Sequence, residues 1–269
     1  MKIKINKYNI SNEYKKRIIL ISDIHYYKKE NLKVLNEVLE NIKKLNPDYI
    51  CIAGDIIDDN NIKDKELLVE WFKKLSKVSK VLIGLGNHDF NYNGKMTKKY
   101  DTCLFKKIDN IKNIYVLDSK IYTDSRINFI GATLPYEYYD LKEDEDELVY
   151  YMNKKFNKLD NNFNIMLVHS PAVIANRKVM KKLKCHKNLD LVLCGHMHGG
   201  LNFEFMNKIL KGRGLISPKS QLFGKYCNGI YNIDNTKVII STGITKLAKS
   251  HKIALLNNIY SSEIVVIDI

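Results

Sequence analysis

The 269-residue chain lacks features that would assign it to a membrane or a secretory pathway. It has no run of about 18 consecutive apolar residues, which is the length a helix needs to span a membrane. Its first residues, MKIKINKYNI, are polar and strand-like, with no apolar signal core. We therefore expect neither a transmembrane segment nor a secretory signal, and we expect a cytoplasmic protein.

Cysteine is present, but not at the spacing that disulfide frameworks or zinc sites need. The chain has five cysteines, an odd number, and no two of them form a CxxC pair. Disulfide-rich domains and structural zinc sites both rely on paired cysteines. The pattern therefore predicts free thiols, buried as small apolar side chains in a reducing compartment.

The composition excludes three further classes of protein. Hydrophobic residues make up 45% of the chain and charged residues 28%, as in an ordinary globular protein. These values exclude a disordered tail, a collagen-like chain and a coiled coil. A chain of this size buries roughly three-quarters of its unfolded surface. We therefore expect a single domain, residues 1–269, that folds without disulfides.

Arginine is scarce, although the chain is strongly basic. Only four arginines stand among 44 basic residues, and the formal net charge is +14. Acidic residues gather between Glu137 and Glu147, so the rest of the chain is more basic still. This charge suits a polyanionic substrate or an anionic membrane surface. AT-rich codon usage is the alternative explanation, because lysine, asparagine, isoleucine and tyrosine are all abundant.

Short apolar runs alternate with segments of helical periodicity along the chain. Strands are predicted over residues 17–22, 48–53, 80–85, 113–117, 127–130, 164–168, 189–194, 229–233, 237–241 and 263–269. Helices are predicted over residues 31–45, with Asn31 as N-cap, and over 66–78, 144–159 and 172–183. The alternation predicts a layered α/β fold with parallel pairing early and antiparallel pairing in the last quarter.

Five short polar motifs each follow one of the predicted strands. They are Asp23-Ile24-His25, Gly54-Asp55-Ile56-Ile57-Asp58, Gly86-Asn87-His88-Asp89, His169-Ser170 and Gly195-His196-Met197-His198-Gly199-Gly200. In an open α/β sheet, ligands bind beyond the carboxyl ends of the strands. We therefore expect the five motifs to meet in space, and we expect Gly54, Gly86 and Gly195 to provide sharp turns there.

Histidine is concentrated in these motifs. They hold five of the seven histidines, namely His25, His88, His169, His196 and His198. Burying so many imidazoles beside aspartates without partners would cost several kcal/mol each. A bound cation removes that cost, so the pattern predicts a metal site. Asp89 is interpreted as an ordinary loop acid, and the less favoured alternative is that it supports a ligand from behind.

The order Asp-x-His, Gly-Asp-x-x-Asp, Gly-Asn-His-Asp, His and Gly-His-x-His, between about residues 17 and 200, resembles the calcineurin-like metallophosphoesterase superfamily. Residues 215–243 look like the bacterial YkuE-like branch. The resemblance implies a four-layer α/β/β/α sandwich of two mixed sheets flanked by helices. It also implies an enzyme, a hydrolase that acts on phosphate mono- or diesters or on pyrophosphates.

The resemblance further implies two divalent metal ions that share seven protein ligands. One ion would be held by Asp23, His25, Asp55 and His198. The second would be held by Asp55, Asn87, His169 and His196. Two ions about 3.5–4 Å apart need an anion between them, and Asp55 would bridge them. Mixed nitrogen and oxygen ligands suit manganese, iron, zinc or cobalt.

In the implied mechanism, a hydroxide held between the metals attacks phosphorus in line. His88 would not be a ligand. It would stabilise the transition state or protonate the leaving oxygen, and Asp58 would orient and charge it.

The substrate-binding residues are unknown from the sequence. Where the branch often carries paired aspartates, Gly131 is followed here by Ala132-Thr133-Leu134. Arg213 and Lys219 are weak candidates for contacts with a phosphate.

We expect a phosphorylated small molecule, a nucleotide or a lipid-linked compound as the substrate. A nuclease or nucleic-acid binder is an alternative, although the chain shows no helix-turn-helix, zinc-finger or aromatic RNA-binding signature. A non-catalytic interaction module on the same fold is another alternative. Peripheral contact with an anionic membrane is compatible with the basic composition.

Overall fold

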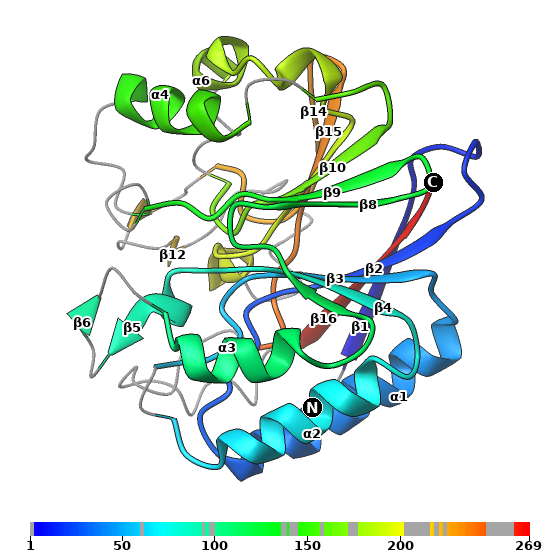
Figure 1. Ribbon diagram of the computed structural model, residues 1–269, viewed down its shortest axis with the longest axis vertical. Coiled ribbons are helices and arrows are strands. Elements are labelled where there is room, and N and C mark those ends of the chain that lie inside the picture. The colour runs from blue at the N-terminus through cyan, green and yellow to red at the C-terminus, as the bar shows by residue number, and fades with distance from the viewer. Residues whose placement is uncertain are drawn as a thin grey trace.

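The fold consists of two six-stranded sheets that face each other, with helices on both outer sides (Figure 1). The computed structural model describes residues 3–59, 62–92, 95–96, 100–135, 139, 145–156, 159–171, 177–201, 216–217, 221–222, 225–245 and 261–269. Arg213, Lys219 and most of the acidic segment after Glu137 lie outside the described residues. The layered α/β/β/α architecture with two mixed sheets is confirmed.

The first sheet has the strand order β1-β16-β2-β3-β4-β7. Its strands are β1 (Ile3–Asn9), β16 (Ser262–Asp268), β2 (Arg17–Ile21), β3 (Tyr49–Ala53), β4 (Lys80–Gly84) and β7 (Ile114–Val116). Neighbours from β2 to β7 are parallel, and β16 is antiparallel to β2 and parallel to β1. The C-terminal strand thus separates β1 from the rest of the N-terminal half.

The second sheet has the order β14-β15-β11-β10-β9-β8. Its strands are β14 (Gly229–Ile233), β15 (Thr236–Ile240), β11 (Leu191–Cys194), β10 (Phe163–Leu167), β9 (Ile127–Gly131) and β8 (Ile121–Asp124). The four central strands are parallel, and both edge strands pair antiparallel with their neighbours. Antiparallel pairing is therefore confirmed near the C-terminus, and it also occurs at β8.

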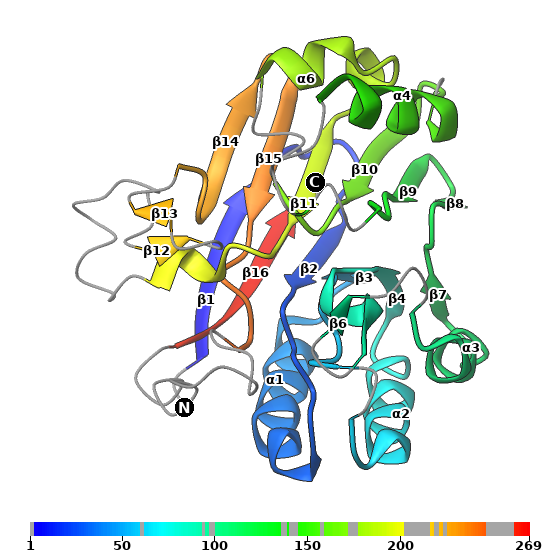
Figure 2. The same ribbon diagram turned by 90° about the vertical axis from the view of Figure 1, so that its left-hand side faces the viewer.

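Helices α1 (Leu32–Leu45), α2 (Lys65–Leu75) and α3 (Thr102–Asp109) cover the outer face of the first sheet (Figures 1 and 2). Helices α4 (Glu145–Lys155) and α6 (Arg177–Lys182) cover the second sheet. Two short hairpins are formed by β5 (Asn91–Tyr92) with β6 (Lys95–Met96), and by β12 (Ile216–Ser217) with β13 (Gln221–Leu222). Short 3-10 helices cover Lys29–Asn31, His88–Phe90, His186–Asn188 and His198–Leu201. Among the described residues, none of the helices has the length and apolarity to cross a membrane.

The start of α1 differs in detail from the sequence prediction. Asn31 precedes the helix, but its side chain makes no cap hydrogen bond to α1. Its Oδ1 instead accepts from the backbone N–H groups of Tyr27 and Lys28, over 3.2 and 3.1 Å. Because Asn31 itself belongs to the preceding 3-10 helix, its side chain closes that turn rather than the α-helix.

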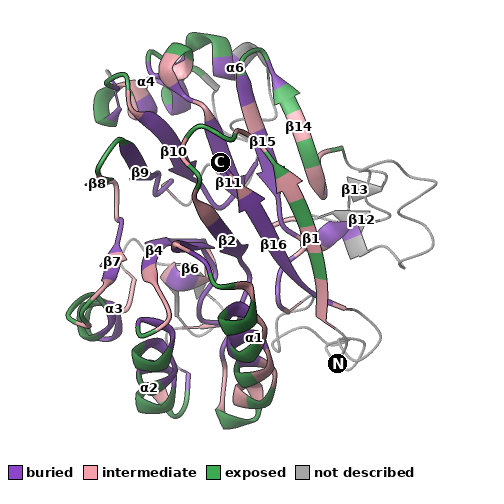
Figure 3. Cartoon of the chain, turned by 90° about the vertical axis from the view of Figure 1, so that its right-hand side faces the viewer, coloured by how far each residue is buried: buried purple, intermediate pink, exposed green. Residues whose placement is uncertain are grey.

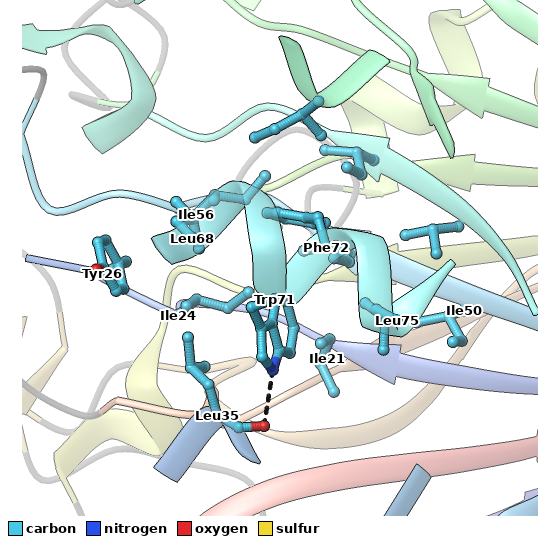
Figure 4. Close-up of a cluster of buried hydrophobic side chains, with 14 of the residues drawn as sticks. Ile21, Ile24, Tyr26, Leu35, Ile50, Ile56, Leu68, Trp71, Phe72 and Leu75 are labelled. Carbon is cyan, nitrogen blue, oxygen red and sulfur yellow. Dashed lines mark hydrogen bonds between the residues drawn. The ribbon is translucent and has the colours of Figure 1, made fainter. Parts of the chain in front are cut away.

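The core lies on both faces of each sheet, which explains why the strands read as continuous apolar runs. In β2, Ile18 and Leu20 pack between the two sheets, whereas Ile19 and Ile21 pack against the helices. The central strands are accordingly buried, and exposed residues lie on the outer faces of the helices and along the edge strands β1, β8 and β14 (Figure 3). Figure 4 shows the helix-side core, where the Trp71 indole N–H donates to the Leu35 carbonyl over 2.9 Å.

The five cysteines are free thiols, as predicted. Four of them are buried and only Cys103 is exposed. Burial raises the pKa of the Cys51 and Cys194 thiols, so these side chains stay neutral and pack as small apolar groups.

Candidate metal centre

The first two motifs lie side by side because the parallel pairing of β2 and β3 continues past the ends of the strands. The backbone N–H of Asp23 donates to the carbonyl of Gly54 over 3.0 Å. Two residues on, the N–H of His25 donates to the carbonyl of Asp55, also over 3.0 Å. The carboxyl-end positions predicted for these residues are therefore found next to each other.

The motifs of the second sheet meet those of the first. The N–H of Gly195 donates to the carbonyl of His169 over 3.0 Å, which joins the ends of β10 and β11. The N–H of His196 donates to the Asp23 carboxylate, over 3.1 Å to Oδ1. A single hydrogen bond thus links residues that stand 173 positions apart in the chain.

Histidine and aspartate side chains converge where these loops meet. Nε2 of His169 lies 3.0 Å from Oδ2 of Asp55, and Nε2 of His25 lies 3.6 Å from the same oxygen. Nε2 of His198 lies 3.6 Å from Oδ1 of Asp23. Asp55 Oδ1 accepts from the backbone N–H of His88 over 2.8 Å, so Oδ2 is the oxygen that faces the two imidazoles.

Three groups of side chains bring their ligand atoms within 4.8 Å of one another. The first group is Asp23, His25 and His198. The second is His25, Asp55 and His88. The third is Asp55, His169 and His196. The structure thus brings together the aspartates and histidines that the sequence motifs predict, and it also places His88 among them.

Two of the histidines are held so that Nε2 is the nitrogen available to a cation. Nδ1 of His169 lies 2.6 Å from the Ala53 carbonyl, and Nδ1 of His198 lies 3.0 Å from the Thr245 carbonyl. A carbonyl oxygen only accepts, so each Nδ1 carries a hydrogen and each Nε2 is the nitrogen that faces the aspartates. Metal-binding histidines are commonly oriented in this way.

Several polar atoms in this region are buried without a hydrogen-bond partner among the described residues. They include Nε2 of His25, Oδ2 of Asp55, Oδ1 of Asn87 and Nε2 of His169; the last of these lies 3.0 Å from Oδ2 of Asp55, close enough for an ion pair when His169 is protonated. Buried polar atoms are nearly always satisfied, so each exception needs a reason. All four belong to predicted ligands, and a divalent cation would satisfy an imidazole lone pair, a carboxylate and an amide oxygen together. The residues present therefore fit a metal site.

The charge states of the site depend on these close contacts. Burial and the neighbouring His169 together lower the pKa of His196 to about 3, so His196 is a neutral imidazole. Burial also opposes the charged form of His169, but Asp55 and Asp23 together raise its pKa to about 9. The Asp55 carboxyl is buried as well, yet His169, His88 and His25 hold its pKa well below the usual value. Asp55 is therefore anionic, as a carboxylate that binds a cation must be.

The backbone at this site adopts a conformation that side chains disfavour. The φ angles are 50° at Asp23, 46° at His25, 52° at Asp55, 70° at His196 and 47° at His198. For a residue other than glycine, the left-handed region costs roughly 1–2 kcal/mol. Such strain collects at functional sites, where the surrounding structure enforces it. All five residues are predicted metal ligands.

His88 and Asp58 lie beside the proposed ligands. Nδ1 of His88 is 2.8 Å from the backbone carbonyl of Asp58 and 3.7 Å from its carboxylate. The same carboxylate lies 3.5 Å from Nδ1 of His25. The His88 side chain is 23% exposed, whereas that of His25 is fully buried. Asp58 thus contacts His88 mainly through its main chain, and its carboxylate lies between the two imidazoles.

The glycines of the motifs serve two different purposes. Gly54 has a φ of +81°, so it provides the predicted sharp turn. Gly86 and Gly195 are not left-handed, and their lack of a side chain matters for space instead. A Cβ at Gly86 would lie 2.3 Å from Oδ1 of Asp55, and a Cβ at Gly195 would lie 2.5 Å from Oδ2 of Asp23. At these two positions the glycine is needed because the backbone comes close to the carboxylates, and their part in a sharp turn stays a prediction.

Asp89 is more than the loop acid that the sequence suggests. Its side chain is fully buried and accepts three backbone N–H groups. Oδ1 accepts from Ile56 over 2.9 Å and from Ile57 over 3.2 Å, and Oδ2 accepts from Gly86 over 2.8 Å. Burial and the negative charge of Asp55 raise the pKa of Asp89 to about 7, against these bonds. In the sequence, the only sign of this role was that Asp89 directly follows Asn87-His88 in a motif of predicted site residues.

Tyr139 is the one described member of the tyrosine cluster that follows Pro135. It is buried, and its ring centroid lies 6.0 Å from that of His169 and 5.8 Å from that of His196. Tyr136 and Tyr138 lie outside the described residues. The described tyrosine therefore packs behind two proposed ligands.

Comparisons with known proteins identify the family of the chain. The family model for calcineurin-like phosphoesterases matches residues 16–200, more than half of the chain. The chain is 24% identical over 229 residues to an uncharacterized metallophosphoesterase of Helicobacter pylori, covering 84% of this chain and 54% of that protein. It is 26% identical over 231 residues to one of Campylobacter jejuni, covering 84% and 53%. The chain thus spans about half the length of these relatives.

A solved structure of a Thermus thermophilus protein has a similar fold, with a TM-score of 0.50 and 14% sequence identity. The match covers 85% of this chain and 89% of that one. From the family match and the order of its motifs, the chain belongs to the calcineurin-like phosphoesterase family.

Proposed function

We propose that the protein is a metal-dependent phosphoesterase that hydrolyses phosphate mono- or diesters or pyrophosphates. The observation that carries the proposal is the convergence of aspartate and histidine ligand atoms on one small region, in three groups whose atoms lie within 4.8 Å of one another. Oδ2 of Asp55 lies at its centre, within 3.6 Å of imidazole nitrogens from both sheets. A structural role alone would leave buried atoms such as Nε2 of His25 without a hydrogen-bond partner, at a cost of several kcal/mol.

In the proposed arrangement two divalent ions share Asp55. One ion would be held by Asp23, His25, Asp55 and His198. The other would be held by Asp55, Asn87, His169 and His196. Manganese, iron, zinc and cobalt all accept this mixture of nitrogen and oxygen ligands. When bound, such a pair of ions lowers the pKa of water and polarises the phosphoryl oxygens.

The remaining residues of the site would handle the leaving group. The Asp58 carbonyl fixes the His88 ring through Nδ1, which leaves Nε2 to carry a second proton. His88 is also the partly exposed imidazole of the second group, so a substrate can reach it. We infer that His88 protonates the leaving oxygen, with Asp58 orienting it and stabilising its positive charge.

The substrate is proposed to be a phosphorylated small molecule, a nucleotide or a lipid-linked compound, as in the YkuE-like branch. Residues 1–269 are proposed to form one domain. The net charge of +14 also supports a polyanionic substrate or peripheral contact with an anionic lipid surface. Nuclease activity that falls steeply with salt would favour nucleic acid, and sedimentation with anionic liposomes only at low salt would favour membrane contact.

The proposal is tested by hydrolysis after loading the metal-free protein with Mn²⁺, Zn²⁺ or Co²⁺. The panel is p-nitrophenyl phosphate, bis(p-nitrophenyl) phosphate and pyrophosphate. We expect turnover that requires metal, and essentially none in Asp55→Ala. Glu40→Ala is the control, because Glu40 is an exposed acid paired only with Lys43 on α1. A protein that binds two ions yet hydrolyses no ester in a broad panel would overturn the proposal and favour a non-catalytic module.

A further inference from the structure

A segment that follows β15, residues 241–245, packs directly behind the first motif. The backbone N–H of Ile244 donates to the carbonyl of Ser22 over 2.9 Å, and the N–H of Thr245 donates to the carbonyl of Asp23 over 2.9 Å. The Thr245 hydroxyl donates to the carbonyl of Ile24 over 2.8 Å. Three consecutive residues around Asp23 are therefore held by this segment.

The same segment also fixes a histidine of the metal centre. The Thr245 carbonyl accepts from Nδ1 of His198 over 3.0 Å, which keeps Nε2 toward Asp23 at 3.6 Å. Gly243 has a φ of +83°, and a Cβ there would lie 2.7 Å from Cβ of Asp23. The segment therefore contacts two of the three residues in the group formed by Asp23, His25 and His198.

A buried carboxylate on β16 holds the segment in place. Glu263 is only 5% exposed, and its Oε2 accepts from the backbone N–H of Thr242 over 2.5 Å. Its Oε1 accepts from the Asn6 side-chain amide. The backbone N–H of Glu263 donates to the carbonyl of Gly243 over 3.1 Å. Glu263 thus binds two consecutive residues of the segment, one through its side chain and one through its backbone.

We propose that Glu263 is a positioning residue for the ion held by Asp23, His25 and His198. Its carboxylate fixes Thr242, and residues 242–245 then present the Thr245 carbonyl to His198. The inference rests on the proposed metal-dependent function. It assigns a role in the site to a side chain that touches none of the ligands.

The effect is expected to be confined to one of the two ions. The other ion would use His169, whose Nδ1 is fixed by the Ala53 carbonyl, and the described contacts of residues 242–245 do not include it. Loss of a residue that orients a metal ligand typically weakens metal binding by about 10–100-fold. Removing the Glu263 carboxylate should therefore lower the binding affinity for one ion by about this factor and leave the affinity for the other unchanged.

The experiment titrates metal-free protein with Co²⁺, following visible absorption and heat of binding. Wild type should bind two ions. Glu263→Ala should bind one with unchanged affinity and one about 10–100-fold more weakly. Glu263→Gln should restore wild-type binding, because its amide oxygen can still accept from Thr242. The matched control is Asp190→Ala, which removes a half-buried carboxylate that accepts the Asn164 N–H at the opposite end of the second sheet.

A second measurement reads the histidine directly. In metal-free, ¹⁵N-histidine-labelled protein, His198 should be protonated at Nδ1 in wild type and in Glu263→Gln. It should become a mixture of tautomers in Glu263→Ala. If Glu263→Ala does not fold, Glu263→Asp takes its place, because it keeps the charge but shortens the side chain by one methylene.

Unchanged binding of both ions in folded Glu263→Ala would overturn the inference. An equal loss of affinity for both ions would also overturn it, because that result would show a general structural role for Glu263. Hydrolysis is measured separately on wild type. If wild type binds two ions without hydrolysing any ester, the proposed function fails, whereas the Co²⁺ titration still decides the role of Glu263.

Discussion

Asp89 offers the sharpest test of how the loops of the metal centre are held together. Its carboxylate accepts three buried backbone N–H groups, from Ile56, Ile57 and Gly86, at 2.8 to 3.2 Å. Leaving a buried donor unsatisfied costs about 1–3 kcal/mol. Three donors therefore place the cost of Asp89→Ala at about 3–9 kcal/mol, a large part of a total stability of about 5–15 kcal/mol.

The asparagine variant separates the three bonds. The amide oxygen of Asp89→Asn can replace Oδ1 and accept from Ile56 and Ile57, but its NH₂ group then faces the N–H of Gly86. One donor is lost instead of three, so the expected cost is about 1–3 kcal/mol. Asp109→Ala is the control, because Asp109 is exposed and accepts a single N–H, from Val116, over 2.7 Å.

The assay is urea unfolding in the presence of a chelator, so that metal binding does not contribute to stability. Wild type and Asp109→Ala should be the most stable, Asp89→Asn less stable, and Asp89→Ala the least stable. If Asp89→Ala unfolds within about 1 kcal/mol of wild type, the three N–H groups find other partners. In that case Asp89 does not hold the loops together.

Two further measurements address single histidines. His88→Ala should slow hydrolysis of an alkyl phosphate by about 10²–10⁴-fold. Hydrolysis of a p-nitrophenyl ester should slow much less, because p-nitrophenolate leaves without a proton. Equal losses of rate on both esters would show that His88 is not the general acid. Zn²⁺ binding at pH 7 should release a proton from His169, whose pKa is about 9, and none from His196, whose pKa is about 3. The affinity for Zn²⁺ should then rise about tenfold per pH unit up to about pH 9. Proton release is measured by calorimetry in buffers of different ionisation enthalpy. If no proton is released, the charge state given to His169 is wrong.

The strands were predictable where both of their faces are buried. β3 reads as an unbroken apolar run and β10 as one interrupted only by the buried Asn164, and their predicted bounds lie within a residue of the observed ones. β8 is absent from the predicted strands because it is a four-residue edge strand with alternating exposure. α3 is also absent, although its N-cap was readable: the Asp101 side chain accepts from the N–H groups of Cys103 and Leu104.

The metal-centre residues were predictable because strand ends carry them to the same edge of each sheet. The residues that hold these side chains in place were not predictable. Glu263 reaches the site only because β16 inserts between β1 and β2, and no local pattern encodes that order. The bond from Thr245 to Asp23 likewise joins residues more than 200 positions apart, neither of which signals the other.

In two of the motifs, a single apolar residue separates two predicted ligands, and the structure shows why. In residues 23–25 and in residues 196–198, both outer residues are left-handed and belong to the metal centre. The middle residue is apolar in each case. Ile24 is buried in the helix-side core of the first sheet, and Met197 packs against the core of the second. Each middle side chain thus anchors its loop. Full burial of one large apolar side chain contributes about 1.5–3 kcal/mol, whereas two left-handed residues cost roughly 2–4 kcal/mol. The buried Ile24 therefore offsets much of the strain in its loop, and the half-buried Met197 offsets a smaller part of the strain in the other.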